Sequence, residues 1–289
     1  MGTSTIGKTR VLYMGREGMV GHDGTPDWSF LYADPSTTRD PAWYIGDRVE
    51  LPDKRAYRYC TAGTLGVVTE MGAAQLRKTS VNAVAPAQAS ATSLGFPARD
   101  TIATGAKGSL FLTVTIGSGF GHLATGVLTK DELRGAYIVI GNGSLQHPQM
   151  ATIVGHPALA AAGTLTVQLA VPLVASVSVG TTNIEIMMNP YTDLSIGNAG
   201  GYASFLGVPV RVATVGQYFW LQTHGPCWIT SDNLTADDAN DRMVYFRGDG
   251  AISSRTDVGS DHLFQPAGFV IDASSAGASN APFVMLQLD

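Results

Sequence analysis

The residues most suggestive of chemistry stand near the start of the chain, where residues 2–9 match the spelling of a phosphate-binding loop, G-x-x-x-x-G-K-[ST]. Such a loop works where a buried strand leads into the glycines and a helix starts at the lysine, because the helix N–H groups then face the phosphates. Here only Met1 precedes the match, and residues 10–15 read as a short extended run that ends at glycine. The sequence therefore predicts a Gly/Ser/Thr-rich terminus rather than a nucleotide site.

Other patterns of catalytic or metal-binding residues are missing from the sequence. It has neither the G-x-S-x-G turn of hydrolases nor the H-E-x-x-H pair of zinc enzymes. The aspartates of residues 231–242 do not follow the calcium-loop register, so we interpret that segment as a solvated turn. The six histidines show no ligand spacing: His22, His122, His147, His156, His224 and His262. We predict no catalytic residue, no cofactor and no metal.

Two further motifs are better explained as turns. Residues 117–122, Gly-Ser-Gly-Phe-Gly-His, have His122 where a dinucleotide loop needs its third glycine. Residues 247–249 spell Arg-Gly-Asp, but Gly248, Asp249 and Gly250 between two apolar runs are what a tight hairpin needs, since these residues tolerate positive φ.

The composition restricts the class of protein. Charged residues make up only 14% of the 289 residues and apolar residues 45%, so we expect a folded chain with a surface that other subunits partly cover. The net charge of −5 comes without a basic cluster, which argues against nucleic acid as a partner. No apolar stretch approaches the roughly 20 residues that cross a bilayer, and no export signal is visible, so we expect no membrane contact.

The two cysteines, Cys60 and Cys227, lie far apart in the sequence and outside any C-x-x-C pair. They are interpreted as reduced core thiols, with a single disulfide as the alternative.

Short runs with alternating apolar residues, separated by glycine and proline, predict an all-β fold of sandwich or barrel type, jelly-roll-like. Two runs each predict a strand with one apolar face; those faces comprise Leu110, Leu112, Val114 and Ile116, and Leu165, Val167, Leu169 and Val171. Further strands are expected at residues 55–60, 183–188, 208–212, 217–223, 243–246 and 282–288. Helical candidates are few: residues 129–132 spell a capping box and could start one turn, and residues 69–78 are ambiguous.

We divide the chain into three regions. Residues 51–100 hold a first strand and an Ala/Ser/Thr/Pro-rich connector, and residues 101–289 hold the main β region, either one sheet system or one with a smaller β subdomain at about 101–185. Residues 1–50 form an extended N-terminal arm that packs on its own domain or reaches a neighbouring subunit. Its aromatic residues are candidate subunit or capsid contacts: Trp28, Phe30, Tyr32, Trp43 and Tyr44.

Residues 216–230 contain two aromatic strand halves around a His-Gly-Pro break. Tyr218 and Trp220 alternate with Phe219 and Leu221, so both faces of this sheet must be covered, by a second sheet or by another subunit.

Several short motifs occur in a characteristic order: residues 53–63, residues 132–143, Asn-Pro-Tyr at 189–191, Gly-Val-Pro at 207–209 and residues 216–226. In this order and spacing the chain, from about residue 53 to its end, resembles the capsid cement (decoration) proteins of tailed bacteriophages. The resemblance implies fold markers at Tyr57, Tyr59, Tyr137, Asn189, Pro190, Tyr191, Gln217, Tyr218, Trp220, Gln222, Gly225 and Pro226. The resemblance does not extend to the arm before residue 53, so it implies no role for those residues.

The resemblance further implies a non-enzymatic virion protein, made in the host cytoplasm, that sits on the outer face of the capsid. Its partners would be the major capsid protein and two copies of itself, as a homotrimer that straddles joints between capsid subunits. The alternative is a host-surface or carbohydrate-binding β-module of a tail or head fibre, with Trp43, Trp220 or Trp228 as stacking platforms.

Overall fold

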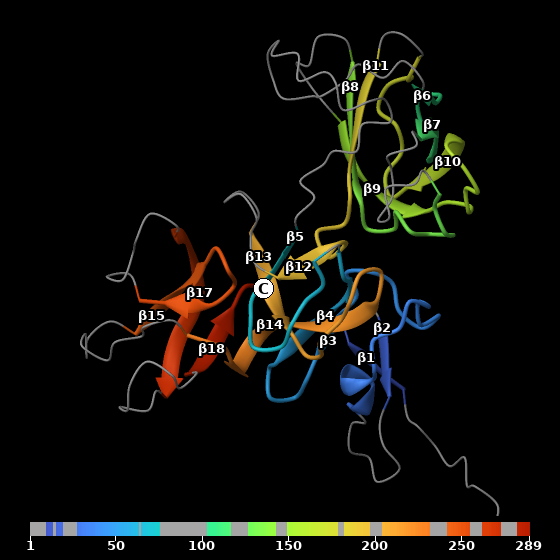
Figure 1. Cartoon of the computed structure of the whole chain (residues 1–289). Coiled ribbons are helices and arrows are strands. Elements are labelled where there is room, and N and C mark those ends of the chain that lie inside the picture. Colours follow the sequence, from blue (N-terminus) through green and yellow to red (C-terminus); the bar gives the residue numbers. More distant parts are fainter. Residues whose placement is uncertain are drawn as a thin grey trace, which may run out of the picture. The chain divides into compact units, whose positions relative to one another are not determined.

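The computed structural model describes residues 10–13, 16–19, 28–63, 65–75, 103–116, 127–142, 149–178, 182–196, 204–231, 242–254, 262–272 and 282–289. Within these ranges the secondary structure is β-strand apart from one short 3₁₀ helix, η1 (Ser29–Tyr32), and every pairing between the strands is antiparallel (Figure 1). The predicted all-β class is therefore confirmed. No helix among the described residues is long and apolar enough to span a bilayer.

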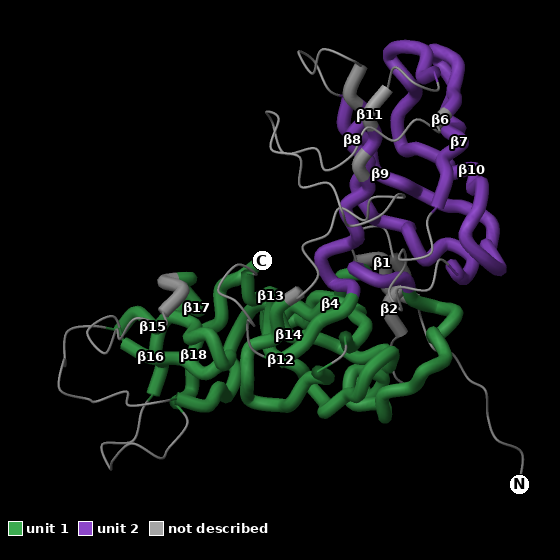
Figure 2. Tube along the Cα trace, turned by 45° about the horizontal axis from the view of Figure 1, so that its top comes forward, with its two compact units in different colours: residues 1–43, 47–76, 193–289 green, residues 44–46, 77–192 purple. Residues whose placement is uncertain are grey.

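The chain divides into two compact units, which Figure 2 shows in different colours. Unit 1 consists of residues 1–43, 47–76 and 193–289, and unit 2 of residues 44–46 and 77–192. Unit 2 thus overlaps the span, about 101–185, in which the sequence suggests a smaller subdomain, and it extends further on both sides.

Unit 1 contains a ten-stranded sheet. Its main path runs in the order β12-β5-β13-β14-β18-β17-β15-β16, and β3 and β4 branch from it because β4 also pairs with β14. The strands are β3 (Arg48–Glu50), β4 (Ala56–Thr61), β5 (Ala73–Gln75), β12 (Leu194–Ile196), β13 (Phe205–Pro209), β14 (Tyr218–Trp228), β15 (Met243–Arg247), β16 (Ile252–Ser253), β17 (His262–Asp272) and β18 (Phe283–Gln287). A separate hairpin joins β1 (Arg10–Tyr13) to β2 (Arg16–Met19).

Strand β14 connects the parts of unit 1 because it changes partner along its length. Residues 218–224 pair with β4, and residues 224–228 pair with β18. The change coincides with the predicted His-Gly-Pro break: the register shifts between Gln222 and His224, and Gly225 has φ +94. A Cβ at Gly225 would lie 2.9 Å from Cα of Arg55, so a larger residue would collide with backbone. The break is thus a bend within one continuous strand.

Unit 2 contains a six-stranded sheet in the order β11-β8-β9-β10-β7-β6, which curls into a half-barrel (Figure 1). Side chains of alternate residues point inward and form one apolar core, which includes Leu112, Ile138, Ile153 and Val167. The strands are β6 (Ala103–Thr104), β7 (Phe111–Ile116), β8 (Tyr137–Asn142), β9 (Gln149–Gly155), β10 (Gly163–Leu169) and β11 (Thr182–Met187).

The predicted alternation holds inside strands and fails at their ends. Leu112, Val114 and Ile116 of β7 are buried, as are Leu165, Val167 and Leu169 of β10. Leu110 precedes β7 and Val171 follows β10, and both are exposed, which contradicts their predicted place on the inward faces. The reason is that strict alternation of side chains requires extended backbone, and the strands do not include these two positions.

Three local predictions are confirmed. Glu132 accepts a hydrogen bond from the Thr129 backbone N–H (2.8 Å), as in a capping box, and only a turn follows. Residues 248–250 connect β15 to β16 as a tight hairpin, with Gly250 at φ +93. Both cysteines are free and buried.

Several sequence predictions lie outside the described residues. These are the phosphate-loop spelling at residues 2–9, the Ala/Ser/Thr/Pro-rich connector at 82–98, the Gly-rich residues 117–122 and the aspartates at 232–241.

Candidate functional site

An aromatic cluster covers one face of β14. The rings of Phe30 and Trp43 are stacked with centroids 5.3 Å apart, and each meets the Trp220 ring edge-on, at 5.3 and 4.9 Å. Tyr59 of β4 adds a contact to Trp220 at 5.2 Å. We expected a second sheet or another subunit to cover this face. The chain's own N-terminal segment covers it instead.

Hydrogen bonds fasten this segment to the sheet. The Tyr218 N–H donates to the Ser36 carbonyl (2.7 Å), and the Asp40 N–H donates to the Tyr59 hydroxyl (3.1 Å). Gln217 contributes a third bond, from Nε2 to the Pro35 carbonyl (3.2 Å).

The five predicted contact aromatics do not form one surface. Phe30 and Trp43 belong to the cluster, and Trp28 lies beside Phe30 with centroids 6.3 Å apart. Tyr44 belongs to unit 2, where the Arg134 guanidinium lies 4.1 Å above its ring. Tyr32, by contrast, is 52% exposed.

The residues implied as fold markers occupy strand cores and turns. Tyr57 and Tyr59 are buried on β4, and Tyr218, Trp220 and Gln222 are buried on β14. Asn189 closes a turn with Pro190 and Tyr191: its Oδ1 accepts the Tyr191 N–H (3.0 Å), and its Nδ2 donates to the Ile45 carbonyl (2.9 Å). Tyr137 differs, because it begins β8 with its side chain exposed.

A pocket of about 260 Å³ opens in unit 1 where the end of β14 meets β4 and β13. Its wall includes Tyr32, Arg55, Tyr57, Glu70, Gln222 and Trp228. Trp228 is 53% exposed, whereas Trp220 is buried and Trp43 is partly buried in the aromatic cluster. Of the three tryptophans considered as stacking platforms, Trp228 lines this pocket and is the most exposed.

Arg55 is the cation in the pocket wall, and its charge is already compensated. Its Nε donates to Asp53 Oδ2 at 2.7 Å, and the guanidinium also interacts with the hydroxyls of Tyr32 and Tyr57. Burial raises the pKa of Tyr57 to about 12, so this phenol stays protonated. Arg55 therefore contributes no strong positive field to the pocket.

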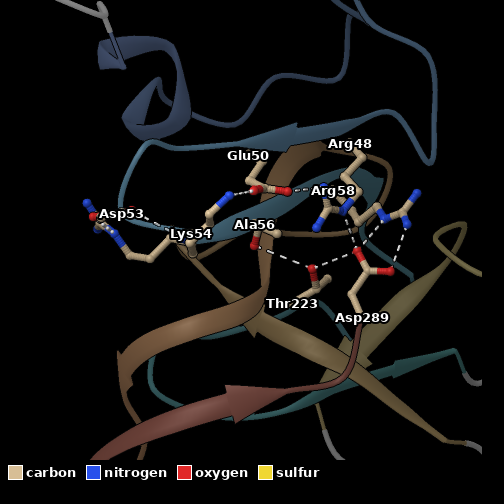
Figure 3. A network of polar contacts seen from close by, with 9 residues as sticks. Arg48, Glu50, Asp53, Lys54, Ala56, Arg58, Thr223 and Asp289 are labelled. Carbon is tan, nitrogen blue, oxygen red and sulfur yellow. Dashed lines mark hydrogen bonds and ion pairs between the residues drawn. The ribbon is translucent and has the colours of Figure 1, made fainter. Parts of the chain in front are cut away.

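A second polar network in unit 1 surrounds Asp289 (Figure 3). Arg48 Nε and Arg58 Nη2 donate to its carboxylate at 2.9 and 2.8 Å, and the Thr223 hydroxyl lies 3.3 Å from the same group. Burial favours the protonated acid, but the two arginines outweigh burial and lower the pKa of Asp289. This arrangement joins β3 and β4 to the residues after β18, and both arginines are engaged with carboxylates of the same network, so we assign it a structural role.

The two cysteines lie in the core of unit 1. Burial raises the pKa of Cys227 to about 12 and that of Cys60 well above its usual value, so neither thiol forms the reactive thiolate at neutral pH. Within the described ranges no group of three or more His, Cys, Asp or Glu residues could hold a metal ion.

His156 in unit 2 is held as a neutral imidazole. Its Nε2 accepts the Leu133 backbone N–H (2.8 Å), so the proton must sit on Nδ1, which faces the Pro157 carbonyl at 2.7 Å. Burial lowers the pKa of this histidine.

Sequence reasoning missed the pocket because its wall combines residues between positions 32 and 228. The one available signal was Trp228, a tryptophan at the end of an aromatic strand.

Comparison with protein-family models found no match to the chain, and neither the curated proteins nor the solved structures contain a significantly similar one.

Proposed function

We propose that the chain is a structural protein of a tailed-phage virion, a cement protein that binds the outer face of the capsid and stabilises joints between major capsid subunits. The order of short motifs supports the proposal. The main structural observation in its favour is an exposed apolar face on unit 2, whose residues can be tested one by one.

The apolar face of unit 2 comprises Tyr137 and Val139 on β8, Met150 on β9 and Met187 on β11. Tyr137 lies directly opposite Met187, and Val139 lies directly opposite Met150, so these four residues are neighbours on the outward face. Two polar positions border them, Glu185 opposite Val139 and Thr152 opposite Tyr137. Met150 is 65% exposed, and Tyr137 and Met187 are also exposed. Contiguous exposed apolar side chains mark interaction surfaces, and methionines adapt to a partner's shape.

The other flank of the same sheet is different. The outward positions of β7 and β10 carry a ladder of threonines, in which Thr113 lies opposite Thr166 and Thr115 opposite Thr164. Threonines suit a solvated β-surface, and the exposed apolar residue at the start of β7, Phe111, lies opposite the polar Gln168. The contrast favours the apolar face as the place where another protein binds.

A shell under pressure from packaged DNA fails at the joints between its subunits. A protein that binds two neighbouring subunits stabilises the closed shell by its binding free energy. In a homotrimer the second and third contacts form at high effective concentration, so weak individual contacts add up to firm attachment. Apolar contact faces suit such permanent assemblies.

The test is binding to heads of the phage that encodes the chain. We expect the purified protein to be a trimer in light scattering and to sediment with emptied heads. Met150→Lys should weaken head binding at least tenfold, because a charge would be buried in the contact. Thr166→Lys, on the threonine flank of the same sheet, is the matched control and should change binding less than twofold.

Copy number in purified virions separates a cement protein from a fibre component. A cement protein approaches the copy number of the major capsid protein, whereas fibres are scarce. A monomer that does not sediment with heads and is absent from purified particles would refute the proposal.

A further inference from the structure

The pocket beside Trp228 has a composition that the capsid role does not require. Tyr32 and Trp228 both line it, and each leaves more than half of its surface exposed. Large aromatic side chains normally lose most of their exposed surface in the fold, as Trp220 does in the same strand. Two exposed aromatics at one concave site therefore offer flat apolar surfaces to a ligand.

Two polar side chains of the pocket wall, Gln222 and Glu70, have free hydrogen-bond acceptors. Gln222 donates both amide hydrogens internally, to the carbonyls of His224 (3.1 Å) and Pro226 (2.9 Å), which leaves its Oε1 as an acceptor. Glu70 also lines the pocket, and its carboxylate has no ion-pair partner among the described residues. The ligand should consequently supply donors.

The backbone at Glu70 adds an independent observation. Glu70 has φ +67, a conformation that non-glycine residues rarely adopt, and its carbonyl is fixed by the Thr230 N–H at 2.7 Å. Strained residues persist where the surrounding structure holds them, and they concentrate at ligand sites. Here the residue with the rare backbone conformation is one of those that line the pocket.

Charge and size restrict the ligand further. The Arg55 charge is compensated by Asp53, so Glu70 leaves the pocket unattractive to phosphate or other anions. A volume of about 260 Å³ lies just below the range of about 300–1,000 Å³ that holds drug-sized ligands, so it suits one ring-sized group. A sugar ring combines a flat C–H face with several hydroxyl donors.

We propose that this pocket binds one neutral pyranose unit of a glycan, with the sugar face against Trp228 and its hydroxyls donating to Glu70 and Gln222. Arg55, held by Asp53, donates to a ring or hydroxyl oxygen. The site is independent of head binding, because no residue of the apolar face of unit 2 lines it.

Saturation-transfer NMR on the full chain tests the proposal. The probes are the methyl glycosides of glucose, galactose, mannose and N-acetylglucosamine at millimolar concentration, with glucosamine and glucuronate as charged comparators. We expect transfer to at least one neutral glycoside. Trp228→Ala should weaken that binding about tenfold, the loss of one aromatic stacking surface. Phe111→Ala is the matched control, since Phe111 is an aromatic of similar exposure (55%) on β7 of unit 2.

A second variant, Glu70→Gln, keeps the side-chain shape and removes the charged acceptor. It should weaken neutral-sugar binding several-fold, and a one-dimensional spectrum of each variant confirms the fold. The proposal is overturned if none of the four neutral glycosides binds, if glucosamine or glucuronate binds better than all of them, or if Trp228→Ala and Phe111→Ala have equal effects.

Discussion

The two units cover their sheets in different ways. In unit 1 both faces of the first half of β14 are buried, because the N-terminal segment places Phe30 and Trp43 over Trp220. In unit 2 the inward side chains of the sheet are buried, whereas outward residues such as Thr166 on one flank and Met150 and Met187 on the other are exposed. A sheet face that the chain covers itself serves stability, whereas one left open is available to a partner.

The units also differ in how they hold their titratable groups. Unit 2 buries His156 as a neutral ring, whereas unit 1 keeps Asp289 ionised between two arginines. Acid should therefore weaken the two units in different pH ranges.

The largest effect should come from Trp220→Ala, which removes the centre of the aromatic cluster in unit 1. We expect a loss of about 3–5 kcal/mol, typical of a buried tryptophan, confined to unit 1. Hydrogen exchange of β4 and β14 amides should accelerate while β8 and β9 stay protected. Trp228→Ala, on the same strand but exposed, should cost less than about 0.5 kcal/mol. Equal losses in the two variants would show that the cluster does not stabilise unit 1.

His156→Ala should weaken unit 2 by about 1–3 kcal/mol at pH 8, because it leaves the buried Leu133 N–H without an acceptor. When the native sequence is unfolded, His156 binds a proton near pH 6.5. In the folded state its pKa is lowered, so protonation requires a lower pH. The free energy of unfolding of unit 2 is therefore not reduced by His156 above pH 6.5. It falls as the pH drops below that value, because protonation then favours the unfolded chain.

Denaturation at pH 8 and pH 5.5, followed through methyl signals of the unit 2 core, measures this dependence. The variant should lose less stability between the two pH values than the native chain. An unchanged pH dependence would mean that His156 is not the titrating group.

Asp289→Asn should destabilise unit 1 by about 1–2 kcal/mol at neutral pH, because two partly exposed charge-assisted contacts are weakened. The pKa of Asp289 is lowered from 3.8, so its contribution is present above that pH and disappears as the pH falls through the folded-state pKa. Urea unfolding at pH 7 and pH 2.5 should show a larger difference from the native chain at pH 7 than at pH 2.5. Asp272→Asn, an exposed residue at the end of β17, is the control and should have no effect at either pH.

The smallest change in stability should follow Met150→Lys, within about 0.5 kcal/mol of the native value, since the side chain is exposed. Its predicted loss of head binding would then be a direct effect on the contact face. A large loss of stability would instead show that the Met150 side chain packs within unit 2. The outward face of unit 2 would then not be open to a partner.

Strand positions were predictable because side-chain alternation is a local property. The inward faces of β7 and β10 follow from residues two positions apart, and the hairpin at Gly248–Gly250 follows from residues that tolerate positive φ. The same reasoning failed at Leu110 and Val171 because it could not show where each strand ends. The Gly-Pro bend of β14 was visible as a break, but the change of partner at that bend was not.

The candidate site was largely unpredictable. Trp228 could be suspected from its type, whereas Glu70 and Gln222 join it only when β14 and the residues before β5 come together. The number of possible pairings between such distant residues is too large for any local pattern to select one.

The sequence by itself determined the all-β class and the positions of about half of the described strands, because each depends on near neighbours or on composition. It favoured reduced cysteines but left a disulfide as the alternative, and the structure shows both thiols free. Only the tertiary structure decided that the N-terminal aromatics cover β14, that Arg48 and Arg58 meet Asp289 more than 230 positions away, and that a pocket opens beside Trp228. These contacts join segments that are distant in the chain, so no periodic signal along the sequence records them.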